Sequence, residues 1–525
     1  MNMKYIFSTL ILLPSIALAG VNTKNGDFFI SYADVTQNSA GHELNINRTY
    51  NSKSSYTGWF GYGWASIYET HLVVMPDGAV VVHEQGGGRE NYYYPKDNSK
   101  FQAGVEKIVA AAVAQEKLDA EATADLRKKL LADEDARQKY VLKYGIKTEL
   151  HDGEVAQADQ CSFITRVKDE YRRTKCDSSN LFGDGTDYFD LNGRLIRNEN
   201  EGYKFTIHYS GNQPDRIEDS LGQKLYLLWN ASGQIKKVST GTGAPILTYA
   251  YSEPGNLTMS NEIGGNEYKY EYDSNHNMTQ IGYLDNTSKL MEYNDKSEIT
   301  SVTEPNGSKT TYDYRDDPSN PSMHYWVTTT SIDQYGNKNS QVQEYKLGTD
   351  VAGVEKYAGL VTTQGDAKKD VIMDEQGRVK RVNNSDGSFS EFTYHPKFNK
   401  VSSVLNNDGK TDYKYNQDGS LIRVENSQGQ IITLEYQAKK LISKIVEIKK
   451  SDKNAKRELK FKYNAAGKPI QIKLLGKGTI NVQYDSKGEI ADVSSKQGAA
   501  VALDVTDAFQ TLLEVVKVGG VEMGL

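Results

Sequence analysis

The stretch Tyr415-Asn-Gln-Asp-Gly-Ser-Leu-Ile-Arg-Val424 decides the fold, because its pattern returns about every 21 residues. An aromatic residue is followed by a polar turn with glycine and then by an aliphatic pair. Tyr394 and Tyr436 stand 21 residues before and after Tyr415. Self-similarity at a period of roughly 20 to 50 residues is typical of repeat architectures. We therefore expect one structural unit that is repeated along the chain.

The same register can be followed in both directions. Fourteen positions carry it between Phe189 and Tyr484, with Met373 in one of them and an irregular segment around Tyr345. The other predicted repeat aromatics are Tyr209, Trp229, Tyr251, Tyr272, Tyr293, Tyr314, Tyr394, Tyr415, Tyr436 and Tyr463. The alternative is a set of unrelated hairpins in several small β domains. The persistence of the spacing favours a single continuous array.

Each unit contains two turn signals and two alternating strands. In the unit that starts at Tyr415 the turns are Asp418-Gly419 and Gln428-Gly429, and glycine favours such turns because it accepts positive φ. Ile432, Leu434 and Tyr436 alternate with polar residues, as in a half-buried strand. A sheet of more than about ten strands that twists by roughly 20–25° per strand cannot stay flat. The sequence predicts a mainly β fold, a spiral array of antiparallel hairpins.

Several segments share a family's motifs. Phe189-Asp-Leu-Asn-Gly-Arg-Leu195, Tyr272-Asp273 and Tyr484-Asp-Ser-Lys-Gly-Glu-Ile490 follow a YD pattern. Upstream stand Leu44-Asn-Ile-Asn-Arg-Thr-Tyr-Asn-Ser52 and Trp59-Phe-Gly-Tyr-Gly-Trp64. These segments resemble the repeats of the Rhs (rearrangement hot spot) family and the R-x-Y-x-S and F-G-x-G-W motifs that open its repeat region. The matching motif residues are Arg48, Tyr50, Phe60, Gly61, Gly63 and Trp64.

The resemblance implies more than a repeat. Rhs proteins wind a strip of strands into a hollow shell, with the repeat aromatics stacked in a continuous seam. The array here is shorter than those that enclose whole toxins, which implies a partial shell. Full-length Rhs toxins end in a self-cleavage segment with a D-P-x-G-L motif and then a toxin domain, and residues 497–525 contain neither. We expect instead a C-terminal cap, with a short helix that begins at Asp504 or Thr506.

The N-terminus predicts export. Lys4, an apolar run from Ile6 to Leu13 and Ala17-Leu-Ala19 form a Sec-type signal peptide over residues 1–19, with cleavage before Gly20. No later run is long and apolar enough for a transmembrane anchor. The mature protein is expected in the periplasm or outside the cell.

Cys161 and Cys176 are the only cysteines. A close pair in an exported chain favours a disulfide, which would stabilise the fold by about 3 kcal/mol through its short loop. The alternative is a pair of unbonded, buried thiols.

A helical segment interrupts the β pattern. Residues 105–144 lack proline and glycine, and Val105, Ile108, Val109 and Ala112 follow helical spacing. A break is expected at Asp119 or Thr123, and Gly145 suits the position after the last helix. We interpret residues 97–160 as an insertion between an N-terminal β segment, 20–96, and the array, 161–496. The helices either pack on the shell or form a docking arm, 101–145, for a partner.

The sequence predicts no enzyme. Its eight histidines are scattered, and neither a metal motif nor a nucleophile motif is present, so we expect no cofactor and no metal site. The net charge of -7 gives no basic surface for nucleic acid. Two function classes follow: an exported shell protein that binds a glycan or a protein or serves as a scaffold, and a carrier shell that encloses a separately encoded polypeptide of a toxin or competition system.

Overall fold

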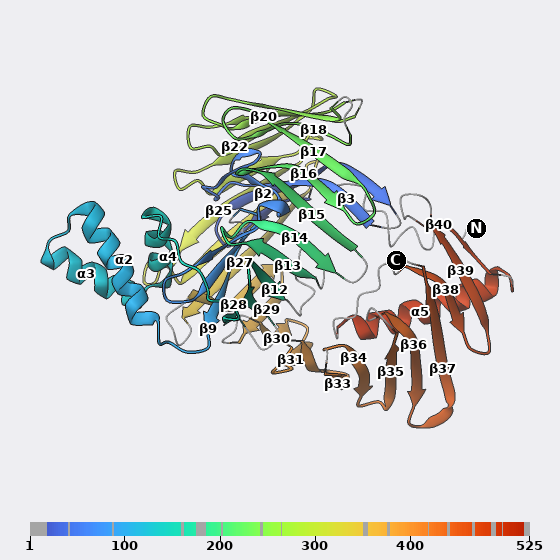
Figure 1. Ribbon diagram of the computed structural model, residues 1–525. Coiled ribbons are helices and arrows are strands. Elements are labelled where there is room, and N and C mark those ends of the chain that lie inside the picture. The colour runs from blue at the N-terminus through green and yellow to red at the C-terminus, as the bar shows by residue number, and fades with distance from the viewer. Residues whose placement is uncertain are drawn as a thin grey trace. The chain divides into compact units, whose positions relative to one another are not determined.

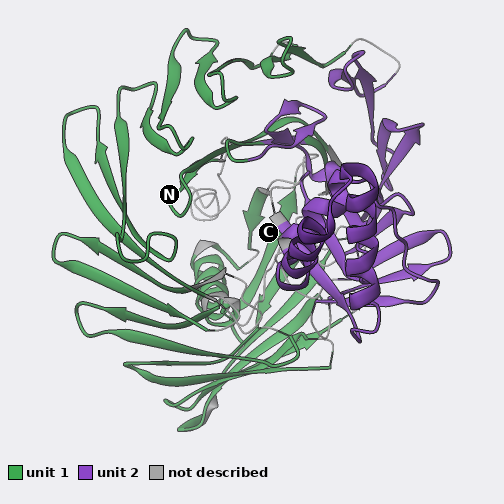
Figure 2. Ribbon diagram, turned by 90° about the vertical axis from the view of Figure 1, so that its left-hand side faces the viewer, with its two compact units in different colours: residues 1–46, 50–53, 244–525 green, residues 47–49, 54–243 purple. Residues whose placement is uncertain are grey.

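The computed structural model describes most of the chain, in two compact units. The described residues are 18–39, 42–86, 89–158, 162–174, 185–200, 203–241, 245–263, 265–349, 355–374, 378–398, 400–417, 419–437, 441–464, 468–484, 490–495 and 497–518. Unit 1 contains residues 1–46, 50–53 and 244–525, and unit 2 contains residues 47–49 and 54–243 (Figure 2).

Unit 2 holds the helices of the insertion and the first hairpins. Its elements are β4 (Thr57–Gly58), β5 (Gly61–Tyr62), β6 (Trp64–Ala65), η1 (Ile67–Glu69), β7 (His71–Val74), β8 (Val80–Glu84), β9 (Arg89–Pro95), α2 (Phe101–Glu116), α3 (Ala120–Ala132), α4 (Glu134–Lys143), β10 (Val155–Gln157), β11 (Phe163–Val167), β12 (Glu170–Thr174), β13 (Thr186–Asp190), β14 (Leu195–Asn200), β15 (Tyr203–Ser210), β16 (Gln213–Asp219), β17 (Lys224–Trp229) and β18 (Ile235–Ser239). From β7 to β18 each strand pairs antiparallel with the next (Figure 1).

Unit 1 holds the opening strands, the remaining hairpins and a C-terminal helix. Its elements are β1 (Leu18–Asn22), β2 (Asp27–Ser39), most of β3 (His42–Asn51), β19 (Leu247–Tyr251), β20 (Leu257–Glu262), β21 (Glu267–Tyr272), β22 (Met278–Tyr283), β23 (Ser288–Tyr293), β24 (Ile299–Thr303), β25 (Lys309–Asp316), β26 (His324–Ile332), β27 (Lys338–Thr349), β28 (Glu355–Gln364), β29 (Ala367–Met373), β30 (Val379–Asn384), β31 (Phe389–Tyr394), β32 (Val401–Asn406), β33 (Gly409–Tyr415), β34 (Leu421–Asn426), β35 (Gln430–Tyr436), β36 (Ile442–Lys449), β37 (Asp452–Tyr463), β38 (Pro469–Leu474), β39 (Gly478–Tyr484), β40 (Ile490–Ser494) and α5 (Ala499–Lys517).

The strands β19 to β40 also pair in chain order. Every step described is antiparallel, from β19 with β20 to β39 with β40. The prediction of a mainly β array of antiparallel hairpins, two strands to a repeat, is confirmed. The irregular segment around Tyr345 has a physical basis, because the consecutive strands β26, β27 and β28 have 9, 12 and 10 residues, more than most strands of the array, and stretch the period there.

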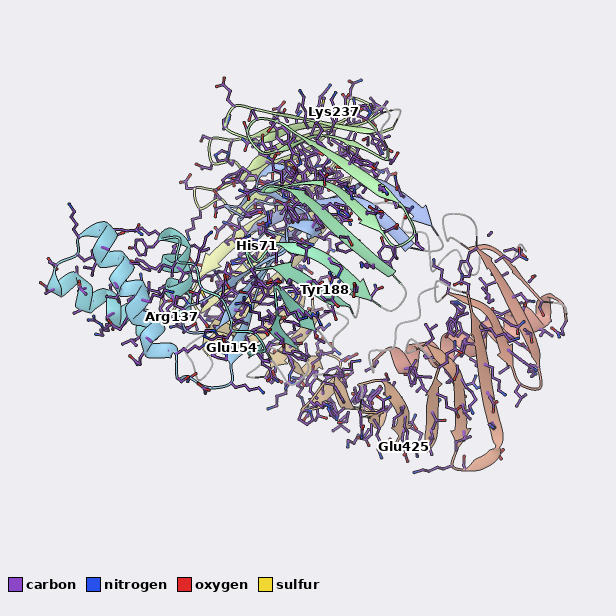
Figure 3. All side chains as sticks on the ribbon, viewed as in Figure 1. His71, Arg137, Glu154, Tyr188, Lys237 and Glu425 are labelled. Carbon is purple, nitrogen blue, oxygen red and sulfur yellow. The ribbon has the colours of Figure 1, made fainter. Side chains whose placement is uncertain are left out.

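The three helices of the insertion pack on the β7–β9 hairpins. Val105, Ile108, Val109 and Ala112 are buried as their spacing predicts, in a cluster that includes Val81 on β8. The apolar stripe of these helices is therefore packed on the hairpins, so a docking role would have to use their outer side. Arg137 on α4, labelled in Figure 3, fixes the contact. Its Nε lies 3.4 Å from Asp77 Oδ2, and its guanidinium lies over the Phe101 ring.

The breaks between these helices are capped by aspartates. Asp119 accepts a hydrogen bond from the Ala122 amide and starts α3, at one of the two predicted positions. A second break was not predicted: Asp133 both ends α3 and caps α4, through a bond from the Ala136 amide. Gly145 follows the last helix with φ of +60°, as expected.

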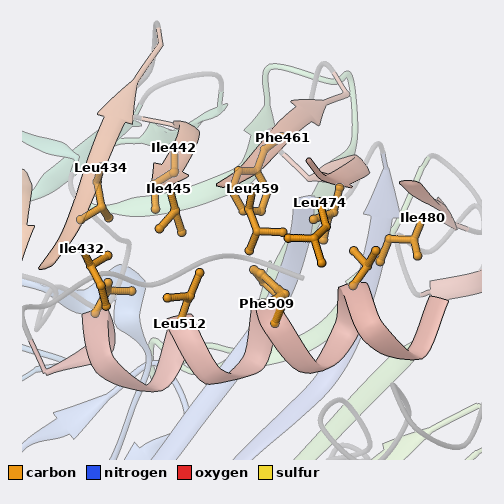
Figure 4. Packing of buried hydrophobic residues seen from close by; sticks show 14 of the residues in the cluster. Ile432, Leu434, Ile442, Ile445, Leu459, Phe461, Leu474, Ile480, Phe509 and Leu512 are labelled. Atoms are coloured by element: carbon orange, nitrogen blue, oxygen red, sulfur yellow. The ribbon is translucent and has the colours of Figure 1, made fainter. Parts of the chain in front are cut away.

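The C-terminal helix α5 packs on one face of β33–β39. Val505, Phe509 and Leu512 are buried against side chains such as Ile445 and Leu459 (Figure 4). The predicted start at Asp504 or Thr506 is wrong. The helix begins at Ala499, because Ala502 and Val505 already contribute to the buried stripe, and the Thr506 hydroxyl donates to Ala502 O within the helix instead of capping it.

The predictions of a disulfide and of a signal peptide fall largely on residues outside the described part of the chain. Cys161, Cys176 and most of the predicted signal peptide, up to residue 17, lie outside the described residues. The strand β1 begins at Leu18, two residues before the predicted cleavage point. Within the described part of the chain, no helix combines the length and apolar character needed to cross a bilayer.

Candidate functional site

The repeat aromatics share one position in their hairpins. Between the residue before the aromatic and the aromatic itself, the register of the two paired strands shifts by one residue. Such a shift is a β-bulge, with the extra residue on the strand opposite the aromatic. The shift occurs at Phe189, Tyr209, Trp229, Tyr251, Tyr272, Tyr293, Met373, Tyr394, Tyr415, Tyr436, Tyr463 and Tyr484. Tyr314 is the exception, since β25 and β26 pair through it without a shift. The repeat therefore reproduces a local geometry as well as a spacing.

The polar residue after the ring holds the turn. In the turn after Phe189, Asp190 Oδ1 accepts from the amides of Asn192 at 3.0 Å and Arg194 at 2.9 Å. Asn230, Asp273 and Asn294 make the same pair of bonds in their turns, and Asp374, Asn416 and Asn464 make the second of the two. This is the Asx turn that Asp and Asn favour, because a short side-chain oxygen can replace a backbone acceptor. It gives the aspartate of the YD pattern a structural reason.

Eight of the repeat aromatics also bond to the preceding repeat, whereas the Tyr293 hydroxyl is buried without a hydrogen-bond partner among the described residues. The Tyr415 hydroxyl donates to Val401 O at 2.6 Å, and Val401 is the residue that pairs with Tyr394, the previous repeat aromatic. The same rule gives Tyr209 to Leu195, Trp229 to Pro214, Tyr314 to Ile299, Tyr394 to Val379, Tyr436 to Leu421, Tyr463 to Ile442 and Tyr484 to Pro469, at 2.6 to 3.0 Å. We call this series of ring-to-carbonyl bonds the seam.

The acceptors explain why the seam needs a polar ring. At a bulge the ladder of backbone bonds is interrupted, and a carbonyl is left for another donor. Tyrosine and tryptophan carry a donor at the end of an apolar ring, which phenylalanine lacks. Burial raises the pKa of Tyr436 and Tyr484 to about 12, so both hydroxyls keep their proton at neutral pH.

Arginine or lysine side chains lie over the rings at several positions of the seam. The Arg194 guanidinium pairs with Asp190 in its own turn and lies 4.5 Å from the ring centre of Tyr209, the next repeat aromatic. Arg378 is placed in the same way over Tyr394, and Lys468 Nζ lies 5.3 Å from the Tyr484 ring. A basic residue five positions after one repeat position (Phe189, Met373 or Tyr463) thus faces the aromatic of the next repeat. This signal is visible in the sequence but was not used.

At Tyr415 the hydrogen bond to Val401 takes the place of the expected stacking on the neighbouring repeat aromatics. The ring contacts described for Tyr415 are with His395 and Phe398, not with Tyr394 or Tyr436. Bulges and turns separate successive rings, so the hydroxyl spans the gap to a backbone carbonyl. The predicted residues are brought into one repeating arrangement, but by hydrogen bonds and cations.

The opening segment contributes rings of its own to unit 1. The Tyr50 ring lies 6.1 Å from that of Tyr272, in an edge-on arrangement. Its hydroxyl donates to His276 O at 3.0 Å and accepts from the Met278 amide at 2.9 Å, so it fills the turn that follows Tyr272. Tyr50 therefore occupies the bulge of a repeat, although it lies outside the array in sequence.

The other motif residues form a core in unit 2. Arg48 and Trp64 are both fully buried, with the guanidinium 4.5 Å from the ring centre. Phe60, four residues before Trp64 in the sequence, is buried as well. Gly61 and Gly63 between them have φ of +94° and +73°. Non-glycine residues adopt such φ values only with strain, so the turn that presents Phe60 and Trp64 requires glycine. The six motif residues thus lie in buried packing, in hydrogen bonds to the backbone or in a tight turn, which are the surroundings of structural residues.

A buried carboxyl group supports this turn. Glu69 accepts hydrogen bonds from the amides of Trp59 at 2.6 Å and Ser66 at 2.7 Å. Burial raises its pKa to about 8, because the cost of burying a charge outweighs the hydrogen bonds from these two amides and from the Tyr56 hydroxyl. Glu69 was not predicted, and only the spacing Ser66-Ile-Tyr-Glu69, a capping box, could have indicated it.

A buried ionic network lies in the same unit. Arg173 on β12 is fully buried and forms ion pairs with Glu84 on β8 and Asp187 on β13, both at 2.5 Å. Asn198 donates to Asp187 at 2.7 Å, and Asn91 donates to Glu84 at 2.8 Å. Every charge of the network has a partner of opposite sign, which is the arrangement in which buried ions are tolerated. We find here a structural clamp between strands.

The other titratable side chains of the described residues form no further cluster of metal-ligand type. Among them, no three His, Cys, Asp or Glu side chains gather as a metal-binding group. His71 and His83 stack at 4.7 Å, and His324 bonds to Asp317 and Glu344, so these histidines have local partners. Burial, followed by repulsion from His83, lowers the pKa of His71 to about 4.

Two family models match the chain. A domain of unknown function, DUF6531, matches residues 19–92, and the Teneurin YD-shell model matches residues 361–518. Of the curated protein sequences, none matches the chain.

Several solved structures that contain TccC3 are similar to the chain. One is the Tc holotoxin pore of Photorhabdus luminescens with a mutated TccC3, at 12% identity and a TM-score of 0.36, over 89% of this chain and 24% of that one. Two crystal structures of TcdB2 with TccC3 have 11% identity and TM-scores of 0.39 and 0.38, over 98% and 94% of this chain and 29% and 28% of theirs. The chain spans less than a third of the length of these structures.

Proposed function

Because the chain belongs to the Rhs family of YD-repeat proteins, we propose that it is an exported, non-enzymatic shell protein that serves as a binding or structural scaffold of the cell envelope or exterior. The observation that supports this role most is that the chain covers apolar faces of its hairpins with its own segments. In unit 1, α5 covers β33–β39. In unit 2, α2–α4 cover the β7–β9 hairpins.

The opening segment supplies a further cover in unit 1. The Tyr32 ring lies 4.7 Å from that of Tyr268, and the Tyr249 hydroxyl donates to Asp34 at 2.7 Å. A strip whose apolar side chains are buried by its own chain needs no second polypeptide to be stable. This self-sufficiency supports a scaffold in preference to a carrier.

The residue roles in the array support a non-enzymatic function. Its Asp and Asn side chains cap turns, its tyrosine hydroxyls bond to carbonyls, and many of its strand carboxylates pair with lysine or arginine. A catalytic carboxylate or hydroxyl would have to be free to reach a substrate.

The remaining parts of the proposal follow the sequence. Residues 1–19 are a signal peptide, and the mature chain starts at Gly20 and works in the periplasm or outside the cell. It consists of the opening segment 20–96, the insertion 97–160, the array 161–496 and the cap 497–525. A disulfide between Cys161 and Cys176 would form in that oxidising compartment. The ligand is a glycan or a protein.

The insertion remains the proposed docking element. Its outer side exposes Leu142 by 53% and Leu131 by 38%. Deleting 101–145 would also uncover the β7–β9 hairpins, so we propose the milder variant Leu142→Lys. A docking arm predicts that this variant loses partners in a pull-down from the native cell, while Leu475→Lys, at an equally exposed leucine of the array, keeps them. An unchanged partner list for Leu142→Lys would refute the arm.

One observation favours a carrier. In β29, β30 and β31 no side chain is buried, which leaves this part of the array without a cover among the described residues. An enclosed polypeptide would bury one of its faces.

Purification from the native cell separates the two functions. The mature protein would be isolated under mild conditions and weighed by native mass spectrometry, beside the same chain produced alone. A scaffold gives the same mass in both preparations, or a mass increase that protease treatment of the intact complex removes. A stoichiometric second polypeptide that resists protease until the shell is unfolded would contradict the scaffold and establish the carrier.

A further inference from the structure

A cleft of about 390 Å³ lies in unit 1, where the opening segment meets the array. One wall is the turn that contains Lys24, and another is the turn of residues 294–298 that follows Tyr293. Tyr314 on β25 and Tyr325 on β26 line it as well. Its volume is within the range of roughly 300–1,000 Å³ that small-molecule sites occupy. One residue of the seam, Tyr314, therefore lies on the wall of the cleft.

The walls of the cleft are held by hydrogen bonds. The Ile299 amide donates to Gly26 O at 2.9 Å, and Lys53 Nζ donates to Lys296 O at 2.8 Å. The backbone at Gly26 is so close that a Cβ there would lie 2.5 Å from Glu298 Cβ. The cleft is therefore formed before a ligand arrives, which lowers the entropic cost of binding.

The two tyrosines offer carbon surface to the cleft. The Tyr314 hydroxyl donates to Ile299 O at 2.9 Å, and the Tyr325 hydroxyl donates to Lys24 O at 2.7 Å. Because both donors are already engaged, the rings present mainly their apolar bodies to a ligand.

The polar lining has both signs of charge. Asp295, Glu298 and Asp316 contribute carboxylates, and Lys24 and Lys296 contribute ammonium groups. The pair Lys296–Asp316 is loose, at 3.6 Å, and both side chains are at least half exposed. Such groups can turn toward a ligand at little cost.

We propose that this cleft is a binding site for a neutral saccharide. The inference rests on the proposed binding role and names its ligand class. A carboxylate only accepts hydrogen bonds and an ammonium group only donates them, whereas a hydroxyl does both. A molecule rich in hydroxyls and carrying apolar C–H surface can therefore satisfy the carboxylates, the lysines and the two rings together. An anion such as phosphate would be repelled by the three carboxylates, whereas a cation could engage the carboxylates but could accept no hydrogen bond from the two lysines.

Saturation-transfer NMR tests the site on the mature chain. The probes are maltose, lactose and N,N′-diacetylchitobiose, with inorganic phosphate and calcium as charged competitors. We expect transfer to at least one disaccharide, at least tenfold weaker binding by the double variant Asp295→Asn and Asp316→Asn, and no displacement by phosphate or calcium at equal concentration. Asp313→Asn is the matched control on the same strand, outside the cleft, and should bind within twofold of the original chain.

Several results would overturn the site. These are a lack of transfer to all three disaccharides, equal affinity in the double variant, or displacement of the sugar by phosphate or calcium. Circular dichroism of each variant verifies that it is folded. If no disaccharide binds while the native chain still purifies without a protected polypeptide, the saccharide site fails and the scaffold proposal stands.

Discussion

A single phenol ring links two successive hairpins of the array. Tyr415 emerges at a bulge, packs partly against the core under α5 and donates its hydroxyl to Val401 O. The ring therefore acts as an apolar wedge and as a backbone partner. The two contributions can be separated by mutation, since phenylalanine keeps the wedge and loses the bond.

The variant Tyr415→Phe should lower the free energy of unfolding by about 0.5–1.5 kcal/mol, because it leaves the Val401 carbonyl without its donor. Tyr415→Ala should cost about 3–5 kcal/mol, since it also removes the ring. Urea unfolding followed by circular dichroism measures both. Tyr335→Phe is the control at a tyrosine that is 81% exposed, and it should change little. Equal losses for Tyr415→Phe and Tyr335→Phe would show that the hydroxyl contributes nothing.

The titration of a single residue, Glu69, should make the free energy of unfolding depend on pH. Its pKa of about 8 in the folded chain lies above the ordinary value of 4.5, so the folded state binds the proton more tightly than the unfolded state. The free energy of unfolding should therefore fall as pH rises from about 4.5 to about 8, by a few kcal/mol at roughly 1.4 kcal/mol per pKa unit.

Urea unfolding at pH 5 and pH 8 tests this dependence. Glu69→Gln should flatten it, because the amide keeps the acceptor oxygen and does not titrate. Glu253→Gln, at an exposed position, should retain the slope of the original chain. A slope that persists in Glu69→Gln would assign the pH dependence to another group.

At the scale of elements, strands are fastened by clamps that differ between the units. In unit 2 the clamp is Arg173, whose guanidinium holds Glu84 and Asp187 from two different strands. In unit 1 the clamp is α5, which crosses β33–β39 with an apolar stripe. Both replace the single continuous core of an ordinary domain.

The variant Arg173→Met should destabilise the chain by about 3–5 kcal/mol, because it leaves two buried carboxylates without a counter-charge. Arg172→Met is a close control, because Arg172 is the neighbouring residue in the chain and its side chain is 45% exposed. Its loss should stay below about 1 kcal/mol. Thermal unfolding of the two variants side by side measures the difference, and similar melting temperatures would contradict the clamp.

The variant Phe509→Ala should cost about 3–5 kcal/mol, because the ring is buried against Phe461 at 5.9 Å. Leu503→Ala lies on the same helix at 44% exposure and should change stability by less than about 0.5 kcal/mol. Limited proteolysis should then cleave the Phe509→Ala chain first near α5. A helix released equally by both variants would mean that it is not held by its apolar stripe.

At the scale of the whole molecule, the sequence specifies the repeat better than the contacts between repeats. The positions of Tyr394, Tyr415 and Tyr436 and the hairpins between them follow from a period of 21 and from turn residues, which are local signals. The burial of Ile108 and Ala112 follows in the same way from helical spacing. Such features depend on neighbours along the chain.

Other features depend on residues far apart in sequence, and these were missed. Nothing in the spacing of Glu84, Arg173 and Asp187 indicates that they meet, and Tyr50 fills a turn more than 200 residues away. The cleft near Lys24 is formed in the same manner from distant segments. The Asx turns and the basic residues over the rings were accessible, because each lies at a fixed offset from a repeat aromatic.

The central claim is that eight of the repeat aromatics donate a ring hydroxyl or indole N–H to the carbonyl of the residue opposite the previous repeat position. A crystal structure of the mature chain at high resolution tests it directly at Tyr394, Tyr415, Tyr436, Tyr463 and Tyr484. The account predicts oxygen-to-oxygen distances between about 2.5 and 3.0 Å to the carbonyls of Val379, Val401, Leu421, Ile442 and Pro469. Rings that turn their hydroxyls into solvent, or that lie on different faces of the sheet from one repeat to the next, would contradict it.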